Sequence, residues 1–213
     1  MHSNKKNRKS SNGLAELLKA ADSKSYSNEY GKFYEYYVSD EIGEASEYTD
    51  WFQEIRNTRN SDAIKIHINS PGGNLFTTIQ FLQALAETEA HIIASVEGIC
   101  MSAATMLFLA ADEFQIAPHS MFMFHNYSGG SFGKGGEMYD NLVHERKWSE
   151  KLLTDVYSDF LTKAEIQALL NNKDLWMDSD EVIARLKKRD VVVKKKLAAE
   201  AKKKGAQAVD GDE

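Results

Sequence analysis

Hydrophobic and polar positions recur along the chain with two different periods, which predicts strands that alternate with helices. Residues 63–69, Ala-Ile-Lys-Ile-His-Ile-Asn, place an isoleucine at every second position, a period typical of a strand, and we expect His67 to face outward from it. Residues 75–87 carry apolar side chains at helical spacing instead. A second apolar strand at 92–96 precedes a helix of small residues at 102–111. Two successive strand–helix units predict right-handed crossovers and a largely parallel sheet.

Further elements follow from the same pattern and complete an α/β chain. We expect strands at 33–38, 113–117 and 121–125, and helices at about 42–56, 137–160 and 163–170. A glycine-rich loop at 129–136 precedes the longest of these helices. The two prolines, Pro71 and Pro118, lie between predicted elements, where a missing N–H group is tolerated.

Length and composition narrow the class of protein. The 213 residues are enough for one domain of ordinary size, and a hydrophobic content of 42% favours a packed core. No apolar run approaches the roughly 20 residues that a membrane span needs, and no apolar region of a secretory signal follows the basic start. The one cysteine, Cys100, allows no intrachain disulfide, which fits a reducing compartment. We therefore expect a cytoplasmic protein without membrane contact.

Charge is unevenly distributed over the chain, whose net charge is −6. Residues 1–10 carry +4 and residues 184–204 carry +8, whereas residues 11–183 carry −15. An acidic body argues against nucleic acid as the main ligand.

Two predicted strand-to-helix turns carry residues suited to acyl transfer. They are residues 68–73, Ile-Asn-Ser-Pro-Gly-Gly, and residues 98–103, Gly-Ile-Cys-Met-Ser-Ala. Attack of Ser102 on a carbonyl would create an oxyanion that the N–H groups of Gly73 and Ala103 could hold. Each motif alone also has an ordinary interpretation, since the glycines fit a tight turn without a ligand and the serine fits a helix N-cap.

A histidine and an aspartate extend this constellation. His125 ends an apolar run at the carboxyl end of a predicted strand, where open α/β sheets bind ligands, so it could accept the proton of Ser102. The alternative is a hydrogen-bonded structural histidine. Asp174 could orient the imidazole, although nothing local distinguishes it from a surface aspartate. Cys100 is a competing nucleophile, but its apolar neighbours indicate a buried, inert thiol. Because no cluster has metal-ligand spacing, we expect neither a metal nor a cofactor.

These motifs occur in the order found in the proteolytic subunit of the Clp protease, and residues 33–185 resemble this ClpP family. The resembling segments are Ile68–Gly73, Gly98–Ser102, Met123–His125 and Asp174–Glu181. The resemblance implies an α/β, ClpP/crotonase-like fold of strand–helix repeats with a protruding handle helix at about 137–170. Outside the resembling residues we expect a basic, mobile N-terminal arm at 1–32 and a charged C-terminal extension at 186–213.

The resemblance also implies a function for each candidate residue. Ser102 becomes the nucleophile, His125 the general base, Asp174 the orienting acid, and Gly73 and Ala103 the oxyanion donors. The backbone at Gly72, Gly129 and Gly130 becomes a candidate for binding an extended substrate strand. The implied activity is a serine endopeptidase that acts through an acyl-enzyme, without ATP for the chemistry. It would work inside a homo-oligomer, a heptameric ring or stacked rings, on small or unfolded polypeptides.

Some residues depart from the family pattern and affect the expected partner. The usual Gly-Gln-Ala-Ala-Ser-Met is replaced by Gly-Ile-Cys-Met-Ser-Ala, so Ala103 follows the serine in place of methionine. With the unmatched ends, this resembles divergent ClpP-like proteins of phages, some of which are head-maturation proteases. The expected partner is then an AAA+ unfoldase or, in the host cytoplasm, a phage scaffold protein. Two other interpretations stay open, a crotonase-like acyl-CoA enzyme and a catalytically silent ring or scaffold subunit. A serine–lysine signal-peptide peptidase is disfavoured.

Overall fold

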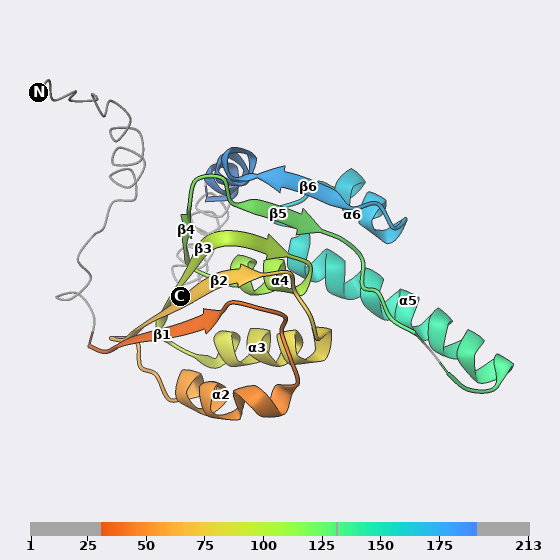
Figure 1. The fold of residues 1–213 in the computed structure, drawn as a ribbon, viewed down its shortest axis with the longest axis horizontal. Helices are drawn as coiled ribbons and strands as arrows, with labels where there is room; N and C mark the ends of the chain where they lie inside the picture. Colours follow the sequence, from red (N-terminus) through yellow and green to blue (C-terminus); the bar gives the residue numbers. More distant parts are fainter. Residues whose placement is uncertain (1–30, 131, 191–213) are drawn as a thin grey trace, which may run out of the picture.

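The computed structural model describes residues 31–130 and 132–190 (Figure 1). Our expectations for the N-terminal arm, and for the extension beyond residue 190, lie outside the described residues. The described strands are β1 (Phe33–Val38), β2 (Ala63–Ser70), β3 (His91–Met101), β4 (Glu113–Ile116), β5 (Met121–Phe124) and β6 (Leu175–Asp178). The helices are η2 (Ala45–Tyr48), α2 (Thr49–Arg56), α3 (Leu75–Glu87), α4 (Ala103–Leu109), α5 (Gly135–Tyr157) and α6 (Lys163–Leu170), followed by a helix over residues 179–190.

The strands form one sheet in the order β1-β2-β3-β5-β6, with β4 paired to the first half of β3. Every pairing from β1 to β5 is parallel, which confirms the predicted α/β fold with its largely parallel sheet. β6 was not predicted, and it pairs antiparallel with β5. Its four residues are too few to show a clear period, so the sequence pattern could not indicate a strand there.

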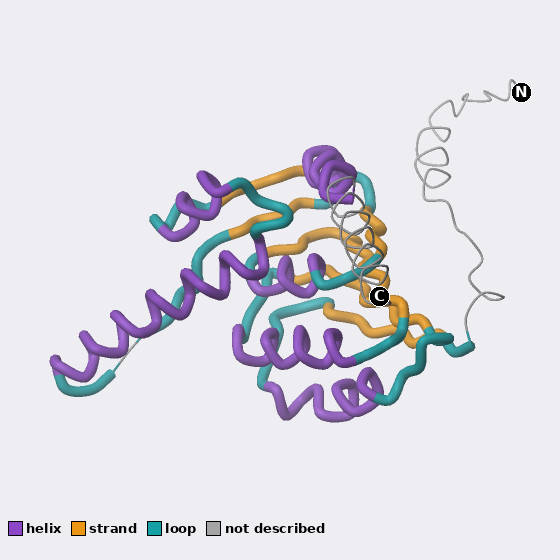
Figure 2. Tube along the Cα trace, turned by 180° about the vertical axis from the view of Figure 1, so that it is seen from behind, coloured by secondary structure: helices purple, strands orange, loops and turns teal. Residues whose placement is uncertain are grey.

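Helices α2, α3 and α4 pack on one face of this sheet (Figures 1 and 2). The alternating isoleucines of β2, Ile64, Ile66 and Ile68, belong to the buried core that these helices cover. All seven residues of α4 are buried, which explains why its sequence consists of small and apolar residues. α4 therefore begins in the interior, whereas Ser102, the residue that precedes it, is only partly buried.

Helix α5 projects away from the body of the protein, as Figure 1 shows. It spans 23 residues, and its buried residues, Ser149, Leu153 and Tyr157, belong to its second half. Its first half exposes large apolar side chains, among them Tyr139 and Leu142. The long helix predicted at about 137–160 and the shorter one at 163–170 are confirmed, together with the protruding helix that the family resemblance implied.

Two local expectations were wrong. The helix expected from residue 42 starts as the short helix η2 at Ala45, because Ile42 is buried and pairs with Gly73 in a parallel bridge. His67, which we expected to face outward, is 9% exposed: its ring stacks on Tyr37 and contacts Glu97. The alternation correctly assigned the isoleucine face of β2, but a sheet can also cover its opposite face with its own side chains.

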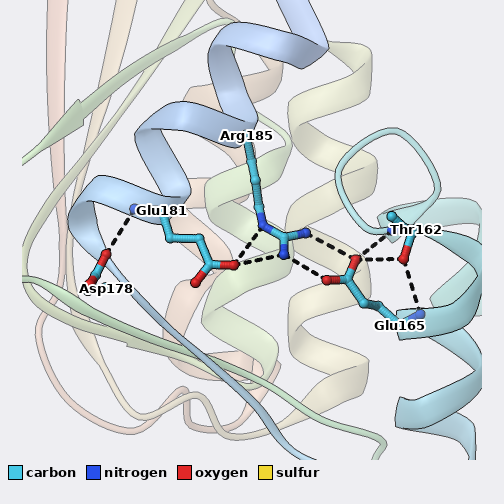
Figure 3. Close-up of polar contacts among 5 residues, drawn as sticks. All are labelled: Thr162, Glu165, Asp178, Glu181 and Arg185. Carbon is cyan, nitrogen blue, oxygen red and sulfur yellow. Dashed lines mark hydrogen bonds and ion pairs between the residues drawn. The ribbon is translucent and has the colours of Figure 1, made fainter.

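The segment that contains β6 is held at its two flanks by ionic contacts (Figure 3). Arg185, on the helix over 179–190, donates two hydrogen bonds to the carboxylate of Glu165 on α6, at 2.7 and 3.0 Å. It also contacts Glu181 at 2.8 Å. Glu165 accepts from the N–H of Thr162, and the Thr162 hydroxyl accepts from the N–H of Glu165, a capping box for α6. These contacts fix the chain before and after β6 relative to each other.

Among residues 31–130 and 132–190, no helix has the length and apolar composition required to span a bilayer.

Candidate active site

Ser102 lies between the end of β3 and the start of α4, in a backbone conformation that few residues adopt. Its φ is 53° and its ψ is −129°, a backbone conformation that is strained for any residue other than glycine. Its N–H group donates to the carbonyl of Met123 on β5, at 2.8 Å. Its side chain makes no cap hydrogen bond to α4. The helix N-cap interpretation therefore does not account for the hydroxyl.

The hydroxyl of Ser102 contacts His125 instead. The distance between Ser102 Oγ and His125 Nε2 is 2.5 Å. Both residues are partly buried, and His125 comes directly after β5. The contact follows from the sheet, because β5 pairs in parallel with the last residues of β3, with Met101 opposite Met123. Ser102, which follows β3, and His125, which follows β5, therefore lie at the same edge of the sheet.

A short chain of buried hydrogen bonds supports Ser102 from behind. The hydroxyl of Thr105, one turn into α4, donates to the carbonyl of Ser102 at 2.6 Å. Its oxygen also lies 2.7 Å from the hydroxyl of Tyr157 on α5, which then serves as the donor. Burial raises the pKa of Tyr157 above its usual value, so it keeps this proton. The base of the protruding helix is thereby connected to the nucleophile.

Two backbone N–H groups beside Ser102 are available to a ligand. Ala103 begins α4, and Gly73 sits in the neighbouring turn with φ +144°. In the described part of the chain, neither N–H group donates to an acceptor, although Ile42 pairs with the carbonyl of Gly72 and with the N–H of Asn74. Unpaired N–H groups at a helix start and a glycine turn suit a developing negative charge.

Ser102 and His125 line a cleft of about 530 Å³. Gly73, Ala103, Gly129 and Gly130 also line it, so the structure brings together most of the residues selected from the sequence. Gly72 does not line the cleft. It packs against Ser102 from the side instead.

Asp174 lies beside this site without contacting it. Phe124, the last residue of β5, is opposite Leu175, the first residue of β6, so the same antiparallel register continued by one residue would bring His125 opposite Asp174. Asp174 is exposed rather than buried, and it makes no hydrogen bond or ion pair with any residue that the structure describes. The segments that carry His125 and Asp174 do contact each other, because the side-chain amide of Asn126 donates a hydrogen bond to Asn172 at 3.3 Å. The two segments are therefore neighbours, although the Asp174 carboxylate makes no hydrogen bond with His125.

The structure gives little support to Cys100 as a competing nucleophile. Cys100 is fully buried, and burial raises the pKa of its thiol, which disfavours the reactive thiolate. Within residues 31–130 and 132–190, no group of three or more histidines, cysteines and carboxylates is placed to hold a metal ion.

The sequence did not reveal four polar or aromatic residues of the cleft wall. Tyr127 follows His125 by two residues, and its hydroxyl donates to Glu145 on α5 at 3.1 Å. Trp148 on α5 makes an edge contact with Tyr127 and stacks on the exposed ring of Phe76. All four residues line the cleft. The spacing of apolar residues along α5 identifies the apolar face of the helix, but it does not indicate which loop packs against that face.

Comparison with known proteins agrees with this geometry. The family model described as Clp protease matches residues 40–185. The chain belongs to the Clp protease family. Among curated relatives, it is 28% identical over 125 residues to the ATP-dependent Clp protease proteolytic subunit 1 of Salinibacter ruber, which covers 57% of this chain and 53% of the relative. It is 25% identical over 120 residues to the proteolytic subunit of Bacteroides thetaiotaomicron, covering 55% and 54%.

A third relative, the proteolytic subunit of Streptococcus mutans, is 25% identical over 132 residues, covering 58% of this chain and 65% of the relative. The chain spans about half the length of the first curated relatives that it matches. The family resemblance predicted from the sequence motifs is confirmed, and with it the ClpP-like fold.

Proposed function

We propose that the chain is a serine endopeptidase in which Ser102 is the nucleophile and His125 the general base. The observation that carries this proposal is the 2.5 Å contact between Ser102 Oγ and His125 Nε2 at the wall of an open cleft. A base within hydrogen-bond reach is the first requirement for activating a serine. A crotonase-like enzyme needs no such pair, so the contact and the family both favour the peptidase.

The reaction follows from the positions of these groups. His125 takes the hydroxyl proton while Oγ attacks the scissile carbonyl, and the N–H groups of Gly73 and Ala103 hold the oxyanion. The protonated imidazole then gives its proton to the leaving amine, which breaks the C–N bond and leaves an acyl-enzyme on Ser102. Water, deprotonated by His125, attacks the ester and releases the acid product with restoration of the serine.

Asp174 is the proposed orienting carboxylate. Directly opposed residues of antiparallel strands have Cβ atoms roughly 5 Å apart. Continuation of the β5–β6 register therefore supports a position from which a side-chain rotation brings the Asp174 carboxylate to Nδ1 of His125. Catalytic hydrogen bonds often tighten only when substrate is bound. The exposed backbone of Gly129 and Gly130 at the cleft supports the pairing of an extended substrate strand there.

Assembly belongs to the same proposal. The curated relatives are named as proteolytic subunits of an ATP-dependent protease. We propose that this chain likewise forms a homo-oligomeric ring, a heptamer or stacked heptamers, whose partner is an AAA+ unfoldase. Exposed apolar residues on the first half of α5, such as Tyr139 and Leu142, are suited to a contact between copies. Native mass spectrometry tests this part, and a monomer at micromolar concentration would contradict it.

The experiment for the catalytic part is hydrolysis of a quenched fluorescent peptide library by the parent chain and by Ser102→Ala. The proposal predicts cleavage by the parent, without ATP, and no cleavage by the variant above the no-enzyme rate. Equal cleavage by both proteins would mean that a contaminant or another residue is responsible. A fully assembled parent that cleaves nothing would favour a silent ring subunit.

A further inference from the structure

The wall of the cleft contains one charged group that the proposed catalysis does not use. Glu145, on α5, lines the cleft together with Ser102 and His125 and is partly buried. It is the only carboxylate among the residues that line the described cleft, and none of these residues is a lysine or an arginine.

The carboxylate of Glu145 has a neutral partner and no cationic one. Its Oε2 atom accepts a hydrogen bond from the hydroxyl of Tyr127 at 3.1 Å. In the part of the chain that the structure describes, it forms no ion pair, and the neighbouring Arg146 and Lys147 are exposed and lie outside the cleft lining. Burial and the Glu145 contact both raise the pKa of Tyr127, so Tyr127 stays protonated and remains the donor.

The surroundings of Glu145 strengthen its preference for a cation. Much of the cleft wall is apolar and includes Met106, Trp148, Leu152 and Leu153. A substrate that fills this space removes water from the carboxylate, and a desolvated carboxylate is costly unless a positive charge accompanies it. The methylene stem of a lysine or arginine would cover the apolar wall while its charged end reaches Glu145.

We infer that Glu145 makes the cleft select polypeptides that carry a lysine or arginine close to the bond to be cleaved. The inference rests on the proposed peptidase function, because it specifies the substrate of that same cleft. A single negative group on one wall acts at one or two substrate positions, whereas the general negative charge of the protein body attracts a cation at every position.

The test measures binding, so that it does not depend on cleavage. An end-blocked hexapeptide series carries an uncharged fluorophore and one lysine, its only charged group, moved through the six positions. A matched series carries norleucine, which has the same carbon chain without the charge. Both series are titrated by fluorescence anisotropy against the assembled Ser102→Ala protein at about 0.15 M salt. We expect about fivefold tighter binding of the lysine peptide at one or two adjacent positions, the gain typical of a partly exposed ion pair.

Two further variants separate the charge of Glu145 from its structural contact. Glu145→Gln, made in the Ser102→Ala protein, keeps an oxygen that accepts from Tyr127 but removes the charge, so the lysine preference should vanish. Tyr127→Phe removes the donor and keeps the charge, so the preference should persist. The inference is overturned if lysine and norleucine bind equally, if lysine helps at every position, or if the preference survives Glu145→Gln.

This outcome is distinct from that of the proposed peptidase. Reaction of the parent chain with a fluorophosphonate reports on Ser102 alone. A silent serine with a position-specific lysine preference would refute the peptidase and retain the cation-selecting cleft. A reactive serine without the lysine preference would retain the peptidase and refute the cation-selecting cleft.

Discussion

The Cα atom of Gly72 lies directly against the side chain of Ser102. A methyl group placed at residue 72 would come within 2.6 Å of Ser102 Cβ and 2.8 Å of the Met101 carbonyl. The backbone of Gly72 also has a φ of +100°, which residues with a side chain rarely adopt. This glycine therefore sets how closely the turn after β2 approaches the nucleophile, although it does not line the cleft itself.

Gly72→Ala should displace Ser102 and destabilise the protein. We expect a loss of at least about 2 kcal/mol in the free energy of unfolding, from backbone strain and steric overlap together. The rate of fluorophosphonate labelling should fall more than tenfold even in the fraction that stays folded. Urea unfolding and intact-protein mass spectrometry measure the two effects.

Gly135→Ala is the matched control for this substitution. Gly135 starts α5, and a methyl group there meets no atom within 4 Å. Its stability and labelling rate should stay at the level of the parent. If both alanine variants behave alike, close packing of Gly72 on Ser102 is not what positions the nucleophile.

Asp174→Asn tests whether the exposed aspartate orients His125 during catalysis. Without the carboxylate, the imidazole loses the group that stabilises its protonated form, and kcat should fall by about 10²–10⁴ with little change in KM. Steady-state peptide hydrolysis gives both constants. Asp180→Asn, at an exposed position after β6, is the comparison and should leave kcat unchanged. A kcat for Asp174→Asn within twofold of the parent would remove Asp174 from the mechanism.

The ionic contact between Glu165 and Arg185 should make stability depend on pH. Hydrogen bonds from Arg185 lower the pKa of Glu165 to about 2, below its ordinary value. A carboxyl group whose pKa is lower in the folded state stabilises the protein above its unfolded pKa, and the stabilisation disappears as pH falls through the folded pKa. The contribution should therefore be complete above about pH 5 and decline towards pH 2.

Glu165→Gln should accordingly cost about 1–2 kcal/mol at pH 7, a value reduced because both side chains are partly exposed to solvent. Urea unfolding at pH 7 and at pH 3.5 should show that the gap between variant and parent narrows in acid. Glu150→Gln, at an exposed position of α5, supplies the baseline. A gap that is the same at both pH values would contradict the assigned pKa.

Several parts of the fold could be predicted because local chemistry determines them. The isoleucines of β2 and the apolar spacing of α3 identify a strand and a helix without further context, and α3 begins and ends where its pattern does. Ser102 and His125 were found because each follows a recognisable strand, and parallel strands carry their following residues to one edge of the sheet.

Other parts depend on contacts that no local pattern encodes. β6 is a short strand recognisable only by its pairing with β5, and only this register, continued by one residue, would bring Asp174 opposite His125. The burial of His67 comes from Tyr37 on a neighbouring strand. Glu145 lies at the cleft because α5 packs against the loop that carries Tyr127, and the two residues in contact are 18 positions apart in the sequence.

Covalent labelling of Ser102 tests the proposed nucleophile most directly. A fluorophosphonate should add one label to each parent chain, located on Ser102 by peptide mass spectrometry. Ser102→Ala should take up no label, and His125→Ala should be labelled at least about 10³-fold more slowly, because the base that activates the hydroxyl is gone. Folded, assembled parent protein that takes up no label, or that labels equally fast without His125, would contradict the proposed nucleophile and base.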